Sequence, residues 1–195
     1  MNIESLLLTA KKVFRYSPAR RRRASRFISE KVSLKYLAFT LLLASASVHS
    51  EPISIRDAAR ASAGIAVWEA LNDQDIQAAH FSYEFSPMED FYSARPTLMM
   101  IYAEGGNIHI SAGLTKEMAI NENFSWGFGS QIGFMDDDRV LGHKIEFYSR
   151  IYGSYHISNI TSASIEFGHI SNSRLGRYNP GSESLVFSIS RTIHR

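Results

Sequence analysis

A chain of 195 residues is long enough for one domain with an interior, and its length does not call for a second. The absence of cysteine excludes disulfides, thiolate catalysis and zinc–thiolate sites. The net charge of +2 hides a division, because residues 1–50 carry 10 Lys and Arg against 2 Asp and Glu, whereas residues 51–195 carry 11 against 17. The basic character therefore belongs to the first part of the chain, and the body is acidic.

Residues 1–50 have the pattern of a secretory leader. A mostly apolar run at residues 36–47 ends in small residues and follows a basic block that includes residues 20–23. This arrangement predicts a signal peptide cleaved after Ala46 or Ser50, since the run is shorter than the about 20 residues of a membrane-spanning helix. A basic block directly before an apolar run is typical of such a leader, so no nucleic-acid partner is predicted. Residues 51–195 then form the mature domain.

From residue 51 onward, short alternating segments separated by turn formers predict an all-β fold. Large apolar side chains alternate with small or polar ones, and this period of two indicates strands. Eight strands are expected, at residues 62–71, 76–85, 95–103, 107–117, 123–134, 141–154, 161–171 and 183–190.

Eight strands of this size fit two architectures. A soluble lipocalin-like barrel places its large apolar residues inside around a ligand, whereas an outer-membrane barrel places them outside toward lipid. The faces opposite the aromatic residues carry Gly, Ser, Gln, Lys, Glu and Arg, which suit the inside of a small transmembrane barrel. The sequence therefore predicts an eight-stranded antiparallel transmembrane β-barrel. Side chains expected at its membrane interfaces are Tyr92, Tyr102, Trp126, Tyr152, Tyr155 and Tyr178.

The last two strands carry the residue types of a serine-esterase charge relay. His169 and Ser171 share the apolar face of their strand with Cα atoms about 6.5 to 7 Å apart, and Glu183 lies on the apolar face of the next strand. A serine nucleophile needs a base to take its proton, and a carboxylate fixes the tautomer of that base and steadies its positive charge. We therefore expect Ser171 as nucleophile, His169 as base and Glu183 as orienting acid, acting on a substrate that lies in the membrane.

The loop between these strands contains donors for an oxyanion. Acyl transfer needs such donors, and the candidates are Asn172, Asn179 and the backbone N–H groups around Gly181. The run from Asp136 to Asp138 lacks the spacing of metal ligands and is expected to be a solvated loop. The sequence predicts no metal and no cofactor.

A second His-x-Ser pair shows that this pair alone is weak evidence. His156-Ile-Ser-Asn repeats His169-Ile-Ser-Asn, but the position fourteen residues after His156 is Ile170, where the second copy has Glu183. The first copy falls where a turn at the opposite rim is expected, so we interpret it as a turn.

The stretch that begins at His169 and reads His-Ile-Ser-Asn-Ser-Arg-Leu-Gly-Arg-Tyr-Asn-Pro-Gly-Ser-Glu-Ser resembles the lipid A deacylase family. These PagL-type outer-membrane enzymes remove an ester-linked acyl chain from lipopolysaccharide, and a His-x-Ser-Asn element, a loop Asn, a Gly and a Glu fall at these spacings in them. The resemblance implies the same roles for His169, Ser171 and Glu183, and Asn179 as an oxyanion-hole contributor. It also implies an eight-stranded barrel with its site on the lipid-facing exterior near the outer leaflet, which makes the protein a lipid A 3-O-deacylase.

Three alternatives stay open. The same serine chemistry could act on phospholipid, the chain could be a structural or adhesive barrel without activity, or the barrel could be soluble and bind a ligand. A His and a carboxylate that face lipid are costly without a function, which argues against the non-enzymatic barrel. The sequence leaves the acyl-chain preference and the oligomeric state undecided, a homodimer included.

Overall fold

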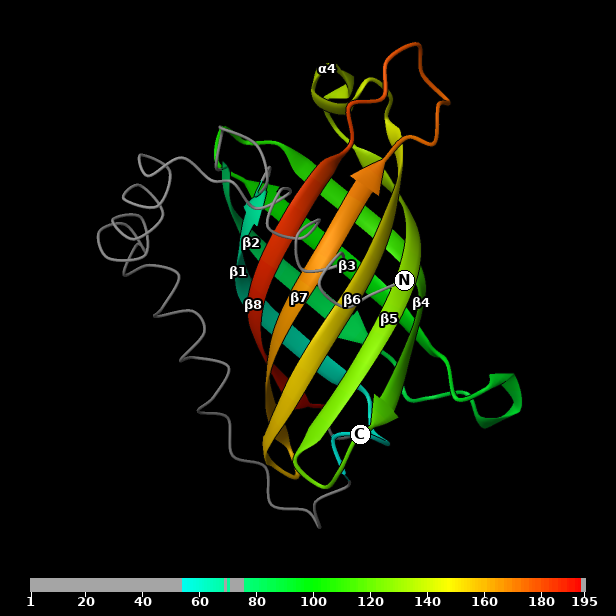
Figure 1. Cartoon of the computed structure of the whole chain (residues 1–195), viewed down its shortest axis with the longest axis vertical. Helices are drawn as coiled ribbons and strands as arrows, with labels where there is room; N and C mark the ends of the chain where they lie inside the picture. Colours follow the sequence, from blue (N-terminus) through cyan, green and yellow to red (C-terminus); the bar gives the residue numbers. More distant parts are fainter. Residues whose placement is uncertain (1–53, 69, 71–75, 194–195) are drawn as a thin grey trace, which may run out of the picture. The chain divides into compact units, whose positions relative to one another are not determined.

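The described part of the chain forms a closed antiparallel β-barrel (Figure 1). The computed structural model describes residues 54–68, 70 and 76–193, so the predicted leader and its cleavage sites lie outside the described residues. The strands are β1 Arg60–Trp68, β2 Ile76–Glu84, β3 Arg95–Ala103, β4 Ile108–Ala119, β5 Phe124–Met135, β6 Ile145–Ser158, β7 Thr161–Ser171 and β8 Ser182–Thr192. Each strand pairs with its neighbour in sequence, and β1 also pairs with β8, which closes the barrel. The predicted all-β class and the count of eight strands are confirmed.

The outer wall of the barrel is apolar. Large apolar side chains point outward and are exposed on the strands, among them Leu98, Ile110, Phe128, Ile132, Ile151 and Phe187. No soluble domain gains by exposing such a continuous apolar surface, whereas a lipid bilayer solvates it. The described residues include no helix long and apolar enough to cross a membrane. The large apolar residues of the alternating segments therefore point outward, as expected of a transmembrane barrel.

One part of the interior holds a charged network, and another part holds buried apolar side chains that include Trp68 and Met135. Arg150 binds Glu84 at 2.8 Å and Glu166 at 2.7 Å, and Arg60 binds Glu84 at 2.6 Å. The Tyr148 hydroxyl adds a hydrogen bond of 2.7 Å to Glu166. Charges that leave water must be paired, and here opposite charges on facing strands satisfy one another across the barrel.

Two further groups of residues shape the rims. At one rim, Arg95 donates hydrogen bonds of 2.9 Å to the carbonyl oxygens of Ala58 and Phe85, and the side chain of Ile55 is buried. At the other rim lie the four-residue helix α4 Asp138–Leu141 and the connection between β7 and β8 (Figure 1).

Three details differ from the sequence-based expectation. Leu141 does not begin β6, because the Asp137 side chain caps α4 and Leu141 is the last residue of that helix. Lys144 does not face the interior, since it precedes β6 and its amine lies 5.8 Å from the centre of the Phe134 ring. Tyr152 is not an interfacial residue: the alternation of β6 turns it inward, where its hydroxyl lies 3.4 Å from Glu117.

Candidate active site

His169 and Glu183 face each other across the β7–β8 pair on the outer wall. They are direct partners in the strand register, and His169 Nδ1 lies 3.3 Å from Glu183 Oε1. Their side chains are 48% and 26% exposed, so both are accessible from outside the barrel. A carboxylate at Nδ1 fixes the imidazole so that Nε2 carries the lone pair, which is the arrangement that a general base requires.

Ser171 is the last residue of β7 and points to the same side as His169. It is half-buried, and in the described part of the chain its hydroxyl makes no hydrogen bond. The structure therefore brings His169 and Glu183 into contact and leaves the serine–histidine contact unmade. Such contacts commonly tighten only when the substrate is bound, and the two-residue spacing along a strand keeps the pair within reach.

Gly181 lies against the free edge of the imidazole. Its φ of +64° belongs to the left-handed region, which glycine adopts without strain. A Cβ atom added at Gly181 would lie 2.9 Å from His169 Cε1 and 3.5 Å from Nε2. The backbone just before β8 thus forms one wall of the space beside Nε2, and that space has no room for a side chain from this position.

Asn172 holds together the two connections at this rim. Its buried side-chain amide donates hydrogen bonds of 2.7 Å to the carbonyl oxygens of Leu141 and Tyr178, and its Oδ1 accepts a bond of 2.8 Å from the Arg174 N–H. The last residue of α4 is thereby tied to the loop at residues 172–181. We name this set of bonds the Asn172 clamp.

Two glycines allow the same connections to approach closely. A Cβ atom at Gly142 would lie 2.1 Å from the Tyr178 carbonyl oxygen, and one at Gly176 would lie 2.3 Å from the carbonyl oxygen of Gly142. The sequence reasoning did not identify this loop-to-loop contact. A glycine directly after α4 is its one local signal, since Gly142 caps the helix in the left-handed conformation.

The bonds of the Asn172 clamp distinguish between Asn172 and Asn179 as candidate donors for the oxyanion hole. Both amide hydrogens of Asn172 are used within the clamp, and its backbone N–H donates a bond of 3.0 Å to Asn179 Oδ1. That bond orients the exposed Asn179, whose Nδ2 has no partner among the described residues. The arrangement favours Asn179 over Asn172 as a side-chain donor.

The wall around the site is apolar. Phe147 of β6 is the register partner of Ser171, and Phe167 of β7 pairs with Leu185 of β8, all on the outward side. A fatty acyl chain that lies along this wall would pass over apolar side chains before it reaches the polar group at the rim.

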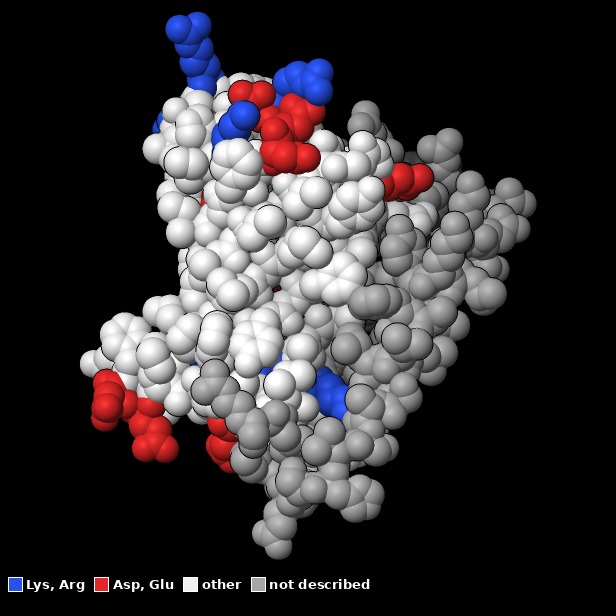
Figure 2. Space-filling view, turned by 180° about the vertical axis from the view of Figure 1, so that it is seen from behind, with Lys and Arg blue, Asp and Glu red and all other residues white. Residues whose placement is uncertain are grey.

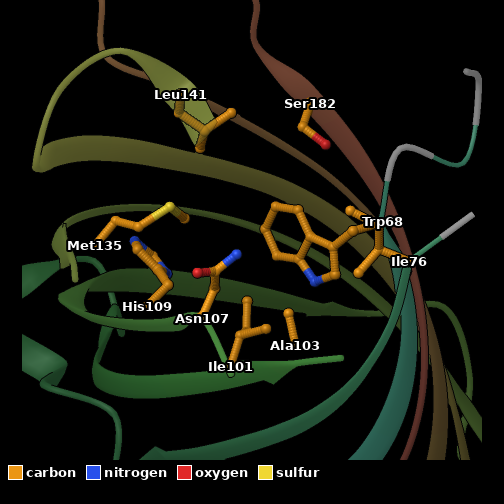
Figure 3. A pocket seen from close by; sticks show the side chains of 9 residues that line it. All are labelled: Trp68, Ile76, Ile101, Ala103, Asn107, His109, Met135, Leu141 and Ser182. Carbon is orange, nitrogen blue, oxygen red and sulfur yellow. The ribbon is translucent and has the colours of Figure 1, made fainter. Parts of the chain in front are cut away.

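The barrel also contains an internal pocket, and it does not serve this site. Trp68, His109, Met135 and Leu141 are among the side chains that line it (Figure 3). Ser182 lines the pocket as well, whereas the next residue, Glu183, points to the outer wall. The wall of the barrel therefore separates the pocket from the candidate catalytic side chains.

The duplicate tetrapeptide faces the opposite way. His156 lies within β6, not in a turn as expected, and is 8% exposed inside the barrel. Its Nε2 lies 3.0 Å from the Ser125 hydroxyl and 3.8 Å from Glu117. The alternation of β6 turns this histidine inward and Ile157 outward, whereas the alternation of β7 turns His169 outward and Ile170 inward.

The acidic run at residues 136–138 has local structural partners. Asp136 accepts a hydrogen bond of 2.8 Å from the Ile108 N–H, and Asp137 caps α4. Hydrogen bonds from Arg139 lower the pKa of Asp137 to about 2. Two of the three carboxylates are thus engaged with the protein itself.

Comparison with known proteins identifies a family and a fold. The family model described as "Lipid A 3-O-deacylase (PagL)" matches residues 77–192, which include the whole candidate site. The crystal structure of the outer membrane enzyme PagL aligns with a TM-score of 0.57 at 19% identity, covering 69% of this chain and 99% of that one. No curated protein sequence matches the chain.

Two other solved barrels are similar in fold. Neisserial surface protein A aligns with a TM-score of 0.52 at 12% identity, covering 69% of this chain and 96% of its own. A de novo designed transmembrane β-barrel aligns with a TM-score of 0.54 at 6% identity, covering 72% and 100%. At such identities structural likeness shows the architecture alone, so activity has to be argued from the site.

Proposed function

The chain belongs to the lipid A 3-O-deacylase (PagL) family, and from this premise we propose that it uses Ser171, His169 and Glu183 to hydrolyse the 3-O ester of lipid A. Its family and its fold make it an ester hydrolase of the bacterial outer membrane. The observation that carries the proposed triad is the 3.3 Å contact between His169 and Glu183 on the lipid-facing wall, beside Ser171. A histidine and a carboxylate in contact with lipid are costly, and a reaction at the membrane surface explains them.

The reaction proceeds in two acyl transfers. The Ser171 oxygen bonds to the carbonyl carbon of the ester while its proton passes to His169 Nε2, and Glu183 steadies the imidazolium. The tetrahedral intermediate then collapses, and the departing 3-oxygen of the sugar takes the proton from His169. Water hydrolyses the acyl-serine by the same route, which releases the hydroxy fatty acid and restores the serine hydroxyl.

Asn179 is the proposed side-chain donor to the oxyanion. Its Nδ2 has no partner among the described residues, and its Oδ1 is fixed by the Asn172 N–H. A donor held in place before the reaction stabilises the negative charge without further reorganisation. Backbone N–H groups near Gly181 are the second source of donors in this loop.

The rim that carries the site is proposed to face the outer leaflet. Outer-membrane barrels have longer extracellular than periplasmic connections. At the site rim, residues 136–144 and 172–181 form long connections and residues 104–107 a short one, whereas at the other rim residues 120–123 and 159–160 form short turns and residues 85–94 a long connection. Two of the three long connections whose residues the structure describes therefore lie at the site rim. We further propose that residues 1–50 are the cleaved leader and that residues 51–195 are the mature barrel, which matches export to this membrane.

The test is the mass of lipid A in a Gram-negative host that lacks such an activity. Expression of the chain is expected to shift the lipid A by one hydroxyacyl chain, and Ser171→Ala and His169→Ala are each expected to abolish the shift. Ser158→Ala is the matched control, because it makes the same change in the duplicate tetrapeptide. Heat-modifiable migration on a gel verifies that each variant is folded.

Each contrary outcome has a defined meaning. Unchanged lipid A with a folded and inserted wild-type barrel would reject the proposed substrate, and release of fatty acid from phospholipid in the same cells would support the phospholipid esterase instead. Full activity of Ser171→Ala would reject the nucleophile.

A further inference from the structure

The connection between β2 and β3 is unusual for its rim. Residues 85–94 separate these strands, whereas the other two hairpins at this rim have connections at residues 120–123 and 159–160. We call residues 85–94 the foot loop. It exposes four large apolar side chains, with Tyr92 85% and Phe91 49% exposed and Phe85 and Met88 also exposed. Exposed apolar side chains on a long connection at this rim are expected to be covered by a binding partner.

The foot loop lies over the outside of the barrel wall. Lys116 is on the outward face of β4, two residues beyond the exposed Leu114, and its amine donates a hydrogen bond to the Tyr92 carbonyl oxygen. Figure 1 accordingly shows the loop projecting sideways beyond β4. The interior at this rim is instead closed by Arg95 and Ile55. The loop therefore extends the lipid-facing surface and does not plug the barrel.

Backbone hydrogen bonds give the foot loop a defined shape. The Phe85 N–H donates to the Pro96 carbonyl oxygen at 2.9 Å, and the Met88 N–H donates to that of Ala94 at 2.9 Å. The short helix η1 Glu89–Phe91 follows, and the chain then turns through Tyr92 and Ser93 with φ values of 54° and 51°. Two consecutive non-glycine residues in the left-handed region are strained, so the fold holds this turn in place at a cost.

The charges of the foot loop are arranged on one side. Its described charged residues are Glu89 and Asp90, and Figure 2 shows the acidic side chains of this projection along its lower edge, away from the middle of the barrel. Exposed aromatic side chains close in sequence to carboxylates are the combination found where a protein crosses from the acyl region of a bilayer into water. Lys116 at the same level suits the headgroup region, since its stem crosses apolar surface and its amine reaches polar atoms.

We propose that the foot loop inserts into the interfacial region of the leaflet at the rim opposite the candidate site, and that it anchors the barrel there at a fixed depth. Its partner is phospholipid. The choice of lipid follows from continuity, because the loop is bound to the outer wall through Lys116, and that wall exposes the apolar side chains that face lipid. Only the name of the leaflet rests on the proposed function: with the site toward the outer leaflet, the foot loop lies in the periplasmic one.

The absence of cysteine provides a direct test. Single variants Tyr92→Cys and Phe91→Cys carry a nitroxide label in vesicles of phosphatidylethanolamine and phosphatidylglycerol, and collisions with oxygen and with a water-soluble nickel complex report depth. Glu89→Cys is the matched control expected in water, and Phe128→Cys, on the exposed wall of β5, is the control expected within the acyl region. The labels at positions 91 and 92 are expected to be severalfold less accessible to nickel than the label at position 89.

Two outcomes would overturn the proposal. Nickel accessibility at positions 91 and 92 equal to that at position 89 would place the foot loop in water. Spin–spin broadening between labels on different molecules would mean that a second copy of the chain covers it. The measurement does not involve lipid A hydrolysis, so its result is independent of the proposed triad.

Discussion

Replacing Asn172 with aspartate tests whether the loops at the site rim must be tied together for activity. Asn172→Asp keeps the shape of the side chain but replaces the amide, which donates to the Leu141 and Tyr178 carbonyl oxygens at 2.7 Å, with an acceptor. Both carbonyl oxygens lose their donor. A buried polar group left without a partner costs about 1 to 3 kcal/mol, so the clamped arrangement loses about 2 kcal/mol or more.

A loss of about 2 kcal/mol corresponds to roughly a thirtyfold change in an equilibrium constant. Loops that bind ligands belong to the least stable parts of a fold, so a change of this size is expected to open the loop that carries Asn179. We expect kcat to fall by roughly thirtyfold or more, while the barrel, whose strands lie outside the clamp, stays folded.

The assay is hydrolysis of purified lipopolysaccharide in detergent micelles, with the product measured by mass spectrometry and folding measured by heat-modifiable migration. Asn159→Asp is the matched control, because it makes the same substitution at the last position of the duplicate tetrapeptide, where the side chain is exposed. Wild-type kcat in a folded Asn172→Asp barrel would refute the inference that the clamp positions the site.

Three other substitutions test separate parts of the structure. Gly181→Ala forces an alanine to φ +64° and places its Cβ 2.9 Å from His169 Cε1; the left-handed conformation alone costs about 1 to 2 kcal/mol, so activity is expected to fall about tenfold. The control Gly105→Ala, also at positive φ but with no atom within 4 Å, is expected to stay active. Equal loss of activity in both variants would show that the contact between residue 181 and His169 does not matter for activity. Arg150→Met removes the ion pair of the buried Glu166, while Glu84 keeps Arg60, and it is expected to destabilise the barrel by about 3 to 5 kcal/mol in urea unfolding from vesicles. An unchanged midpoint would mean that the interior network is not needed. Ala103→Leu extends into the internal pocket and should leave hydrolysis unchanged; a change in acyl-chain preference would instead place the substrate chain inside the barrel.

Much of the fold could be predicted from the sequence because alternation is a local property. A strand turns successive side chains to opposite faces, so the run around Phe128 shows one apolar and one polar side without any knowledge of its neighbours. The outward direction of His169, Ser171 and Glu183 followed in the same way, as did the lipid-facing nature of the wall. Tyr152 is the exception among the expected interfacial residues, and the alternation of β6 itself accounts for its inward direction.

The tertiary structure decided what depends on contacts between distant residues. The register of β7 against β8 makes Glu183 the direct partner of His169, and a shift by two residues would have kept both faces while separating the pair. The use of the Asn172 amide could not be foreseen, because its partner Leu141 lies 31 residues away. The same holds for Lys116 and the foot loop, 24 residues apart. Which side chains face lipid follows from the period of a strand alone. Which of those side chains meet follows from the pairing of strands and loops in space.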